Sequence, residues 1–242
     1  MNQKPTTGLS QNQIKLIAAA AMVIDHVGVE LFPQLTILRI IGRLAFPVFS
    51  YCICEGSRLT HHPWKYFFRL FGMGLLCVIG YYVYTGMFYG NILITFSLSL
   101  CVLYAFQHLQ TCWSQDKITA RLAGVGIMLG CMAGIWLICR WVTIDYGFFG
   151  VILPLFAELS ACIWERYASA DGKQERARLL GFSVGLLVLS LQMGGIQIYS
   201  LLTLPLLFTY NGTRGEKNHK QFFNSFYTVH LLIIGLVSIC IL

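Results

Sequence analysis

The fold is decided near the start of the chain by an almost wholly apolar stretch, Ile14-Lys-Leu-Ile-Ala-Ala-Ala-Ala-Met-Val-Ile-Asp-His-Val-Gly-Val-Glu-Leu-Phe32. A helix of roughly 20 residues spans the hydrocarbon core of a bilayer, so this stretch is long enough to cross a membrane. Its interior holds Asp25 and His26, and a charged residue at that depth costs at least about 2.5–3.5 kcal/mol. Such residues persist where they face other protein or a water-filled path. The pair therefore predicts a working site inside a membrane protein.

The composition of the whole chain also indicates a membrane protein. Hydrophobic residues make up 57% of the 242 residues and charged residues only 11%, against about 25% charged in a typical soluble domain. No small-residue cleavage site follows residues 14–32, so we interpret them as a permanent span rather than a signal peptide. The nine cysteines form no CxxC pairs or ligand clusters, and we expect free thiols that act as small apolar residues.

Further apolar segments predict an all-α, polytopic bundle of about nine transmembrane helices. A short polar tail, residues 1–13, precedes a single transmembrane domain, residues 14–242. We expect the spans near residues 14–32, 36–57, 66–85, 90–108, 119–140, 146–165, 177–193, 196–210 and 222–242. The seventh and eighth spans are short and are separated at Met193-Gly-Gly-Ile196, and the predicted number of spans has an uncertainty of one there.

The basic residues indicate the orientation of these spans. Of the 17 Lys and Arg residues, 14 lie at or before the start of the first span, as Lys4 and Lys15 do, or beside the loops that follow even-numbered spans. The exceptions are Arg39, Arg43 and Arg140. Loops rich in Lys and Arg stay in the cytoplasm. We therefore expect a cytoplasmic N-terminus, and the formal charge of +7 becomes a topology signal rather than a nucleic-acid surface.

The first two predicted spans place polar residues at matching depths. Folding the chain back about residues 33–35 brings three pairs level, namely Lys15 with Glu55, His26 with Arg43, and Glu30 with Arg39. Charges in lipid need partners, so these pairs predict an antiparallel hairpin with inward-facing polar side chains. Salt bridges that only hold helices together are the alternative. For His26 the functional interpretation is favoured, because imidazole transfers protons near neutral pH.

Several short strings occur together along the chain: Met22-Val-Ile-Asp-His26, Ile41-Gly-Arg-Leu-Ala-Phe-Pro-Val-Phe49, Glu55-Gly56 with Thr60, Tyr66-Phe-Phe-Arg69, Asp145-Tyr-Gly147, Tyr210-Asn-Gly-Thr-Arg-Gly215 and Phe226-Tyr-Thr-Val-His-Leu231. With these strings the chain resembles the TraX family over essentially its whole length, and more distantly the acyltransferase-3 type of membrane acyltransferases. The first family is named for a protein that N-acetylates the pilin of a conjugative plasmid. The second type moves acetyl groups from cytoplasmic acetyl-CoA to acceptors at the far face. The resemblance thus implies a membrane-embedded acetyltransferase that uses acetyl-CoA.

The residues and the resemblance together suggest a catalytic group on the first hairpin. We expect His26 to act as general base toward an amine or hydroxyl acceptor, or to take the acetyl group covalently. Asp25 positions the acceptor or pairs with Arg43, and Arg43 stabilises the tetrahedral oxyanion. The more distant acyltransferases carry Arg where this chain has Lys15, which keeps the charge but loses the bidentate fork.

Two further sets of residues are expected to bind the substrates. Coenzyme A carries phosphates that need cytoplasmic cations, and the set expected around it is Lys15, Glu55, Arg58, Arg69, Asn211, Arg214 and His230. Near the outer ends of spans, the set expected to bind the acceptor is Asn91, Thr95, Asp145 and Tyr146. Asn91 and Asp145 suit helix caps equally well, and His230 suits a satisfied histidine of the bundle nearly as well.

The expected partners are acetyl-CoA, the lipid bilayer and an acceptor that the sequence does not identify. A pilin-like peptide N-terminus follows from the resemblance, and a glycan, lipid or small molecule fits the same chemistry. Neither a metal nor nucleic acid is expected. The alternative function is an ion-coupled transporter with an intramembrane Asp/His/Arg relay. The Gly194-Gly195 break favours a transporter, whereas the lack of an internal repeat argues against it.

Overall fold

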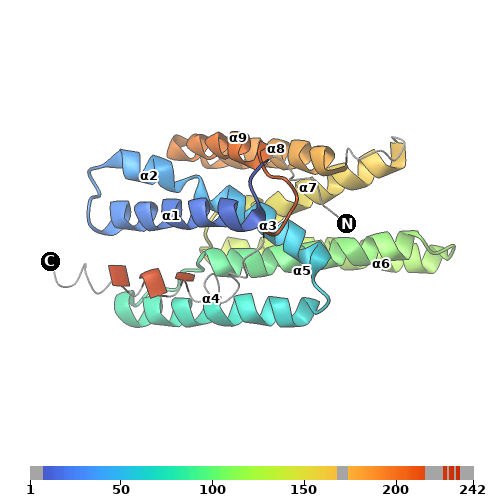
Figure 1. Ribbon diagram of the computed structural model, residues 1–242. Helices are drawn as coiled ribbons and strands as arrows, with labels where there is room; N and C mark the ends of the chain where they lie inside the picture. Colours follow the sequence, from blue (N-terminus) through green and yellow to red (C-terminus); the bar gives the residue numbers. More distant parts are fainter. Residues whose placement is uncertain (1–7, 168–173, 216–225, 228, 232, 235–242) are drawn as a thin grey trace. The chain divides into compact units, whose positions relative to one another are not determined.

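The computed structural model is all-helical in the part of the chain it describes, residues 8–167, 174–215, 226–227, 229–231 and 233–234 (Figure 1). Its elements are α1 (Gln11–Glu30), α2 (Thr36–Gly42), α3 (Ala45–Leu59), α4 (Pro63–Thr85), α5 (Ile92–Trp113), α6 (Ile118–Trp141), α7 (Gly147–Tyr167), α8 (Gln174–Met193), the 3₁₀ helix η1 (Gly195–Leu202) and α9 (Thr203–Phe208). These described ranges contain no strand, only two isolated bridges. The expected all-α class is confirmed.

Six segments in the described ranges are long and apolar enough to cross a membrane. They are α4, α5, α6, α7, α8 and Thr36–Leu59, which α2 and α3 share. The first expected span forms α1, whose polar start and charged residues Lys15, Asp25 and Glu30 lower its hydropathy, and the eighth forms a shorter apolar helix, Gly195–Phe208. Most of the ninth, residues 222–242, lies outside the described residues. The count of nine and the orientation remain predictions.

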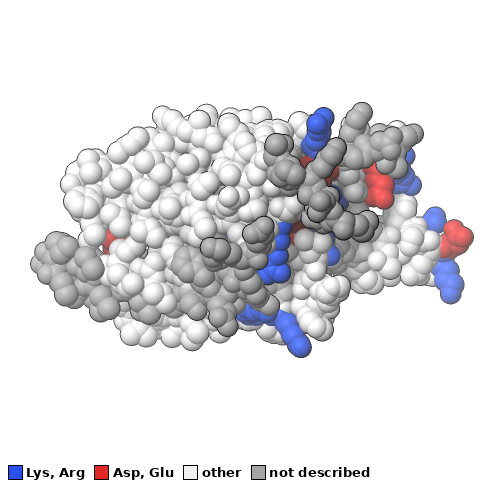
Figure 2. Space-filling model, in the orientation of Figure 1, with Lys and Arg blue, Asp and Glu red and all other residues white. Residues whose placement is uncertain are grey.

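The surface of α4 and α6 is suited to lipid rather than water. Val83 on α4 is 80% exposed and Leu122 on α6 is 65% exposed, and many of their neighbours are similar. If this surface faced water, each such side chain would lack the stabilisation of about 1.5–3 kcal/mol that burial provides. On the face shown in Figure 2, most of the described surface belongs to neither acidic nor basic residues. The described helices are therefore those of a membrane protein.

The chain packs as two compact units, which we describe separately. The terminal unit combines residues 1–52 with residues 190–242, and the central unit is residues 53–189. In the terminal unit, α1 packs on α2, and η1 contacts both α2 and α9. In the central unit, α5 packs against α4, α6 and α7. The apolar core between α5, α6 and α7 consists of Val102, Phe106, Ile135, Val151 and Leu155.

The second expected span, residues 36–57, is interrupted in the structure. Helix α2 ends at Gly42 and α3 begins at Ala45. Pro47 has no amide N–H to donate to the Arg43 carbonyl one turn earlier, and its ring crowds that turn. The helix therefore breaks next to Arg43, one of the expected site residues.

The expected break at the two consecutive glycines is confirmed. Helix α8 ends at Met193, and Gly194 and Gly195 have φ angles of 64° and 54°. Residues with a side chain rarely adopt this left-handed conformation, whereas glycine adopts it freely. The chain then continues as η1, which contacts α2, and as α9, which packs against η1.

Candidate functional site

Two glycines bring α1 and α2 unusually close in the terminal unit. A Cβ atom added to Gly42 would lie 2.2 Å from the Cβ of Asp25, and one added to Gly28 would lie 2.7 Å from the Cβ of Leu38. Small residues at such points allow the backbones of membrane helices to approach. Asp25 consequently faces α2 rather than lipid.

Asp25 is held between two guanidinium groups of the second span. Arg43 Nη2 donates to both carboxylate oxygens at 2.8 Å, and Arg39 Nε donates to Oδ1 at 3.0 Å. The side chains of Asp25 and Arg43 are 18% and 12% exposed. Charge-assisted hydrogen bonds of this kind are roughly twice as strong as neutral ones. The expected pairing of Asp25 with Arg43 is present.

The expected pairing of Glu30 with Arg39 is wrong. Arg39 bonds Asp25, whereas Glu30 is exposed at the last residue of α1 and has no ion-pair partner among the described residues. The close approach of Gly42 to Asp25 shifts the register of the hairpin from the one expected. His26 also meets a different partner from the Arg43 expected at its depth.

His26 contacts His230, which the sequence assigned to cofactor binding. His26 Nδ1 lies 3.0 Å from His230 Nε2, and His230 Nδ1 lies 2.7 Å from the Phe226 carbonyl oxygen. A carbonyl oxygen only accepts, so His230 Nδ1 carries the hydrogen, and the Nε2 of a neutral His230 accepts from His26. His26 Nδ1 is then the donor, which leaves a lone pair on His26 Nε2.

Aromatic rings fix the orientation of His230. The Phe226 ring stacks on it with centroids 4.9 Å apart, and the Tyr227 ring meets it edge-on at 5.5 Å. His230 is 6% exposed. The imidazole is therefore held in one orientation, and with it the proton order of the two histidines.

Gln197 on η1 is a buried polar residue that sequence reasoning missed. It is 3% exposed, and its Oε1 accepts from Arg43 Nη1 at 3.4 Å. Its Nε2 finds no hydrogen-bond partner among the described residues. Leaving a buried donor unpaired costs about 1–3 kcal/mol, so such a group calls for an explanation such as a water, an ion or a ligand. The available signal was a lone Gln in the apolar run directly after the two glycines.

The loop of residues 211–215, expected to approach coenzyme A, contacts the start of α1, and its binding of coenzyme A stays a prediction. Gln11 N and Asn12 N donate to the carbonyls of Thr213 and Arg214 at 2.8 and 3.3 Å. These two carbonyls accept from backbone N–H groups at the start of α1, which have no partner within the helix itself. Asn211 Nδ2 donates to the Gly8 carbonyl at 3.1 Å. The Arg214 side chain is exposed.

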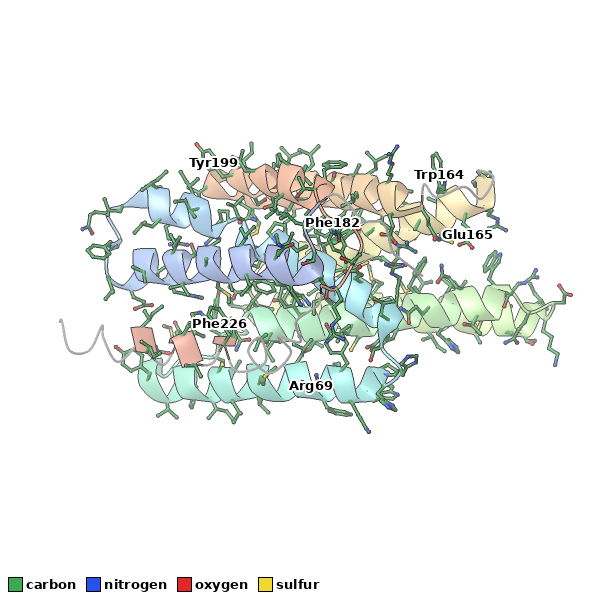
Figure 3. All side chains as sticks on the ribbon, in the orientation of Figure 1. Arg69, Trp164, Glu165, Phe182, Tyr199 and Phe226 are labelled. Atoms are coloured by element: carbon green, nitrogen blue, oxygen red, sulfur yellow. The ribbon has the colours of Figure 1, made fainter. Side chains whose placement is uncertain are left out.

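The other residues expected to bind the cofactor are divided between the units. Lys15 belongs to the terminal unit and donates to Gln11 Oε1 at 3.1 Å. Glu55, which is 6% exposed, belongs to the central unit, and its pairing with Lys15 remains a prediction. Arg69 lies on α4 with an incompletely buried side chain (Figure 3). Arg58 forms ion pairs with Glu158 and Glu175.

The four residues expected to bind the acceptor gather where α4 meets α5 and α6 meets α7. Asn91 caps α5 by accepting from Leu93 N and Ile94 N, and its Nδ2 donates to the Gly74 carbonyl at 2.8 Å. The cap alternative is therefore the one present for Asn91. Thr95 Oγ1 donates to the Asp145 carbonyl at 2.7 Å, and Tyr146 has a φ of 61°.

The Asp145 carboxylate in this group accepts from the Tyr89 hydroxyl. Burial, together with the neighbouring carboxylate, raises the pKa of Tyr89 well above its ordinary value. Tyr89 lies in the connection before α5 and remains a neutral donor at physiological pH. The group stabilises two connections through its own hydrogen bonds.

Membrane-length helices and a polar site built on α1, α2 and η1 define the chain as an α-helical membrane protein. The family model described as TraX protein matches residues 10–238, and the chain belongs to the TraX family. Protein TraX of Escherichia coli is 24% identical over 232 residues, which are 93% of this chain and 86% of that protein. An uncharacterised protein of Rickettsia prowazekii (strain Madrid E) is 34% identical over 137 residues, 57% of this chain, and the match spans only 50% of that relative. No solved structure matches the chain.

Proposed function

We propose that the protein is a membrane-embedded acetyltransferase that moves an acetyl group from acetyl-CoA to an amine or hydroxyl acceptor. The observation that carries the proposal is the order of hydrogen bonds from His26 through His230 to the Phe226 carbonyl. That order presents an unprotonated Nε2 on His26, which a general base requires. Membership of the TraX family supports acetyl transfer, because the family is named for a protein that N-acetylates a pilin.

In direct transfer, His26 Nε2 removes the proton from the acceptor nitrogen or oxygen as that atom attacks the thioester carbonyl. The resulting tetrahedral oxyanion is stabilised by a nearby cation, for which we propose Arg43. Collapse of the intermediate breaks the carbon–sulfur bond, and the coenzyme A thiolate takes the proton back from His26. The acceptor loses one proton, the thiol gains it, and no other reactant is needed.

His230 acts on the reaction through His26. As Nε2 gains a proton, the imidazolium of His26 strengthens its Nδ1–H hydrogen bond to His230. This is the task that a third group performs in catalytic triads, where it orients the base and stabilises its charge. An alternative route places the acetyl group on His26 Nε2 before transfer, and it needs the same lone pair.

The donor site is proposed on the cytoplasmic side of a bacterial inner membrane, where acetyl-CoA is available. The acceptor class follows the resemblance, a pilin-like peptide N-terminus, with a hydroxyl of a glycan or lipid served by the same base. Gln197 Nε2 is proposed as a second donor to the reacting carbonyl oxygen, because it is buried, unpaired in the described structure and bonded through Oε1 to Arg43.

The test is transfer of radiolabel from acetyl-CoA to an envelope extract by purified, detergent-solubilised protein. His26→Ala should abolish labelling while leaving the far-UV circular dichroism spectrum unchanged. His61→Ala, which removes an exposed loop histidine, is the matched control and should label as wild type does. Wild-type labelling by His26→Ala would contradict the role of His26. No labelling by any variant, with no effect of acetyl-CoA on the melting temperature, would favour an ion-coupled transporter.

A further inference from the structure

A polar cleft of about 290 Å³ lies within the central unit, between the end of α3 and helices α5, α7 and α8. Ligand sites in proteins begin at about 300 Å³, so the cleft has room for a small organic molecule or part of a larger one. Charged and amide side chains dominate its lining, among them Arg58, Gln107, Gln110, Glu158, Glu165 and Arg178. Glu165 lies near the end of α7 (Figure 3).

Two guanidinium groups of this cleft and the buried thiol of Cys54 converge on a single oxygen atom. Arg58 Nε and Arg178 Nε lie 3.2 and 3.4 Å from Glu158 Oε1, and Cys54 Sγ is 3.1 Å from the same oxygen. Arg178 and Glu158 are only 5% and 6% exposed. Neither Nε atom forms a hydrogen bond within the described structure. The buried part of the cluster is balanced in charge but does not satisfy its own donors.

A second carboxylate joins the same two arginines from the surface. Glu175 Oε1 accepts from Arg178 Nη1 at 2.7 Å and from Arg58 Nη2 at 3.5 Å. The Glu175 side chain is 51% exposed and belongs to the first turn of α8. An exposed ion-pair partner contributes only about 0–1 kcal/mol, whereas removing a buried one is costly. Glu158 is thus the fixed anion of the cluster, and Glu175 is the replaceable one.

We propose that the cleft binds a phosphate-bearing ligand whose phosphate replaces the Glu175 carboxylate between Arg58 and Arg178. A phosphate offers more acceptor oxygens than a carboxylate and matches the fork geometry of two guanidiniums. With Glu175 displaced, the two arginines keep one buried partner, Glu158, while the other carboxylate of the lining, Glu165, is exposed and accepts from Gln174 Nε2. The amides of Gln107 and Gln110 line the same cleft and offer donors and acceptors to the organic part of the ligand.

The phosphate has two sources, a soluble nucleotide or a phospholipid headgroup. Arg58 and Gln174 line the cleft and belong to polar segments that are expected to be cytoplasmic, and a cytoplasmic nucleotide ligand fits that side. We identify this nucleotide as the adenosine bisphosphate portion of acetyl-CoA, and this identification rests on the proposed function. Binding of a phosphate ester in the cleft does not depend on it.

The experiment measures the affinity of the full-length protein for adenosine 3′,5′-bisphosphate by calorimetry in detergent. Glu175→Ala removes the competing carboxylate, so we expect the Kd to fall about fivefold, the factor that corresponds to an exposed ion pair. Arg58→Lys keeps the charge but loses the fork and should weaken binding. Asp116→Ala removes an exposed carboxylate that pairs with Arg121, and it should leave the Kd unchanged. A Kd that is equal or higher in Glu175→Ala would rule out a nucleotide as the ligand, and the same result with the other phosphate probes would overturn the proposal.

Two further arms identify the source of the phosphate. Inorganic phosphate tests the anion alone, and nanodiscs containing phosphatidylglycerol, compared with phosphatidylcholine, test a headgroup through the melting temperature. A response to Glu175→Ala in the nucleotide arm or in the lipid arm supports the cleft and names its ligand. Absence of a response in every arm overturns it. Acetyl transfer that persists while Glu175→Ala has no effect places the donor elsewhere, whereas phosphate binding without transfer supports the cleft and contradicts only the acetyltransferase.

Discussion

Gly42 has no side chain, and the Asp25–Arg43 ion pair depends on that absence. Gly42→Ala would place a Cβ 2.2 Å from the Asp25 Cβ and 2.4 Å from its Oδ1, so α1 and α2 would have to separate. Overpacking of this kind costs about 1–3 kcal/mol. We expect a lower melting temperature and reduced acetyl transfer. Gly126→Ala on α6, where a Cβ would have no neighbour within 4 Å, is the control and should melt no lower than wild type.

His230 is predicted to act on turnover rather than on binding of the donor. In His230→Ala, His26 loses the acceptor that fixes its tautomer and stabilises its charge, so kcat should fall about 10²-fold, within the range of acid–base contributions. The KM for acetyl-CoA should stay near the wild-type value. Steady-state kinetics with a labelled acceptor separate the two constants. An unchanged kcat with a raised KM would instead return His230 to the cofactor-binding role expected from the sequence.

Gln197 offers a test of function against stability at one position. Gln197→Met nearly preserves volume. It removes a buried donor that lacks a partner and also the acceptor of the 3.4 Å bond from Arg43 Nη1, so the two effects offset and the melting temperature should stay near the wild-type value. If Nε2 binds the reacting carbonyl oxygen, acetyl transfer should fall at least tenfold, since losing one such donor costs up to 10²–10³ in rate. A structural role alone predicts the opposite pattern, namely loss of stability with little specific loss of turnover.

At the scale of elements, helix positions were predictable and partners were not. Apolar runs of membrane length placed α4 to α8 correctly, because hydrocarbon thickness imposes that length. The break after Gly42 was missed, since it depends on Pro47 acting one turn back on the Arg43 carbonyl. The hairpin register was missed as well, because two glycines set it through close approach rather than through charge matching.

Long-range contacts explain why the candidate site was only partly predictable. Asp25, His26 and Arg43 stand out locally as polar residues in apolar runs. Their partners Gln197 and His230 lie far along the chain and carry no sign of the contact. Arg58 was expected to bind coenzyme A, and its ion pair with Glu158 on α7 was not foreseen for the same reason. A single sequence shows which residues need a partner but not which residue provides it.

The packing of α8 on α7 is predicted to control the phosphate cleft. A Cβ on Gly181 would lie 2.1 Å from Ser160 Oγ and 2.4 Å from the Phe156 carbonyl oxygen. Gly181→Ala should therefore push α8 away from α7 and separate Arg178 from Glu158. We expect both a lower melting temperature and weaker binding of adenosine 3′,5′-bisphosphate. Gly130→Ala on α6, an open position, should change neither, and normal binding in Gly181→Ala would show that the cleft does not depend on this contact.

For the whole molecule, binding and chemistry are assigned to residues of different units, so variants should separate them. A ligand that binds only the folded state stabilises it, by about 2.7 kcal/mol at a concentration of 100 times Kd. Acetyl-CoA should therefore raise the melting temperature of wild type and of His26→Ala equally, because His26 acts on the acceptor proton and not on the donor phosphates. Glu175→Ala should show a larger rise at the same acetyl-CoA concentration, as its cleft lacks the competing carboxylate. Differential scanning fluorimetry on the three proteins measures this, and loss of the rise in His26→Ala would mean that donor binding also depends on the terminal unit.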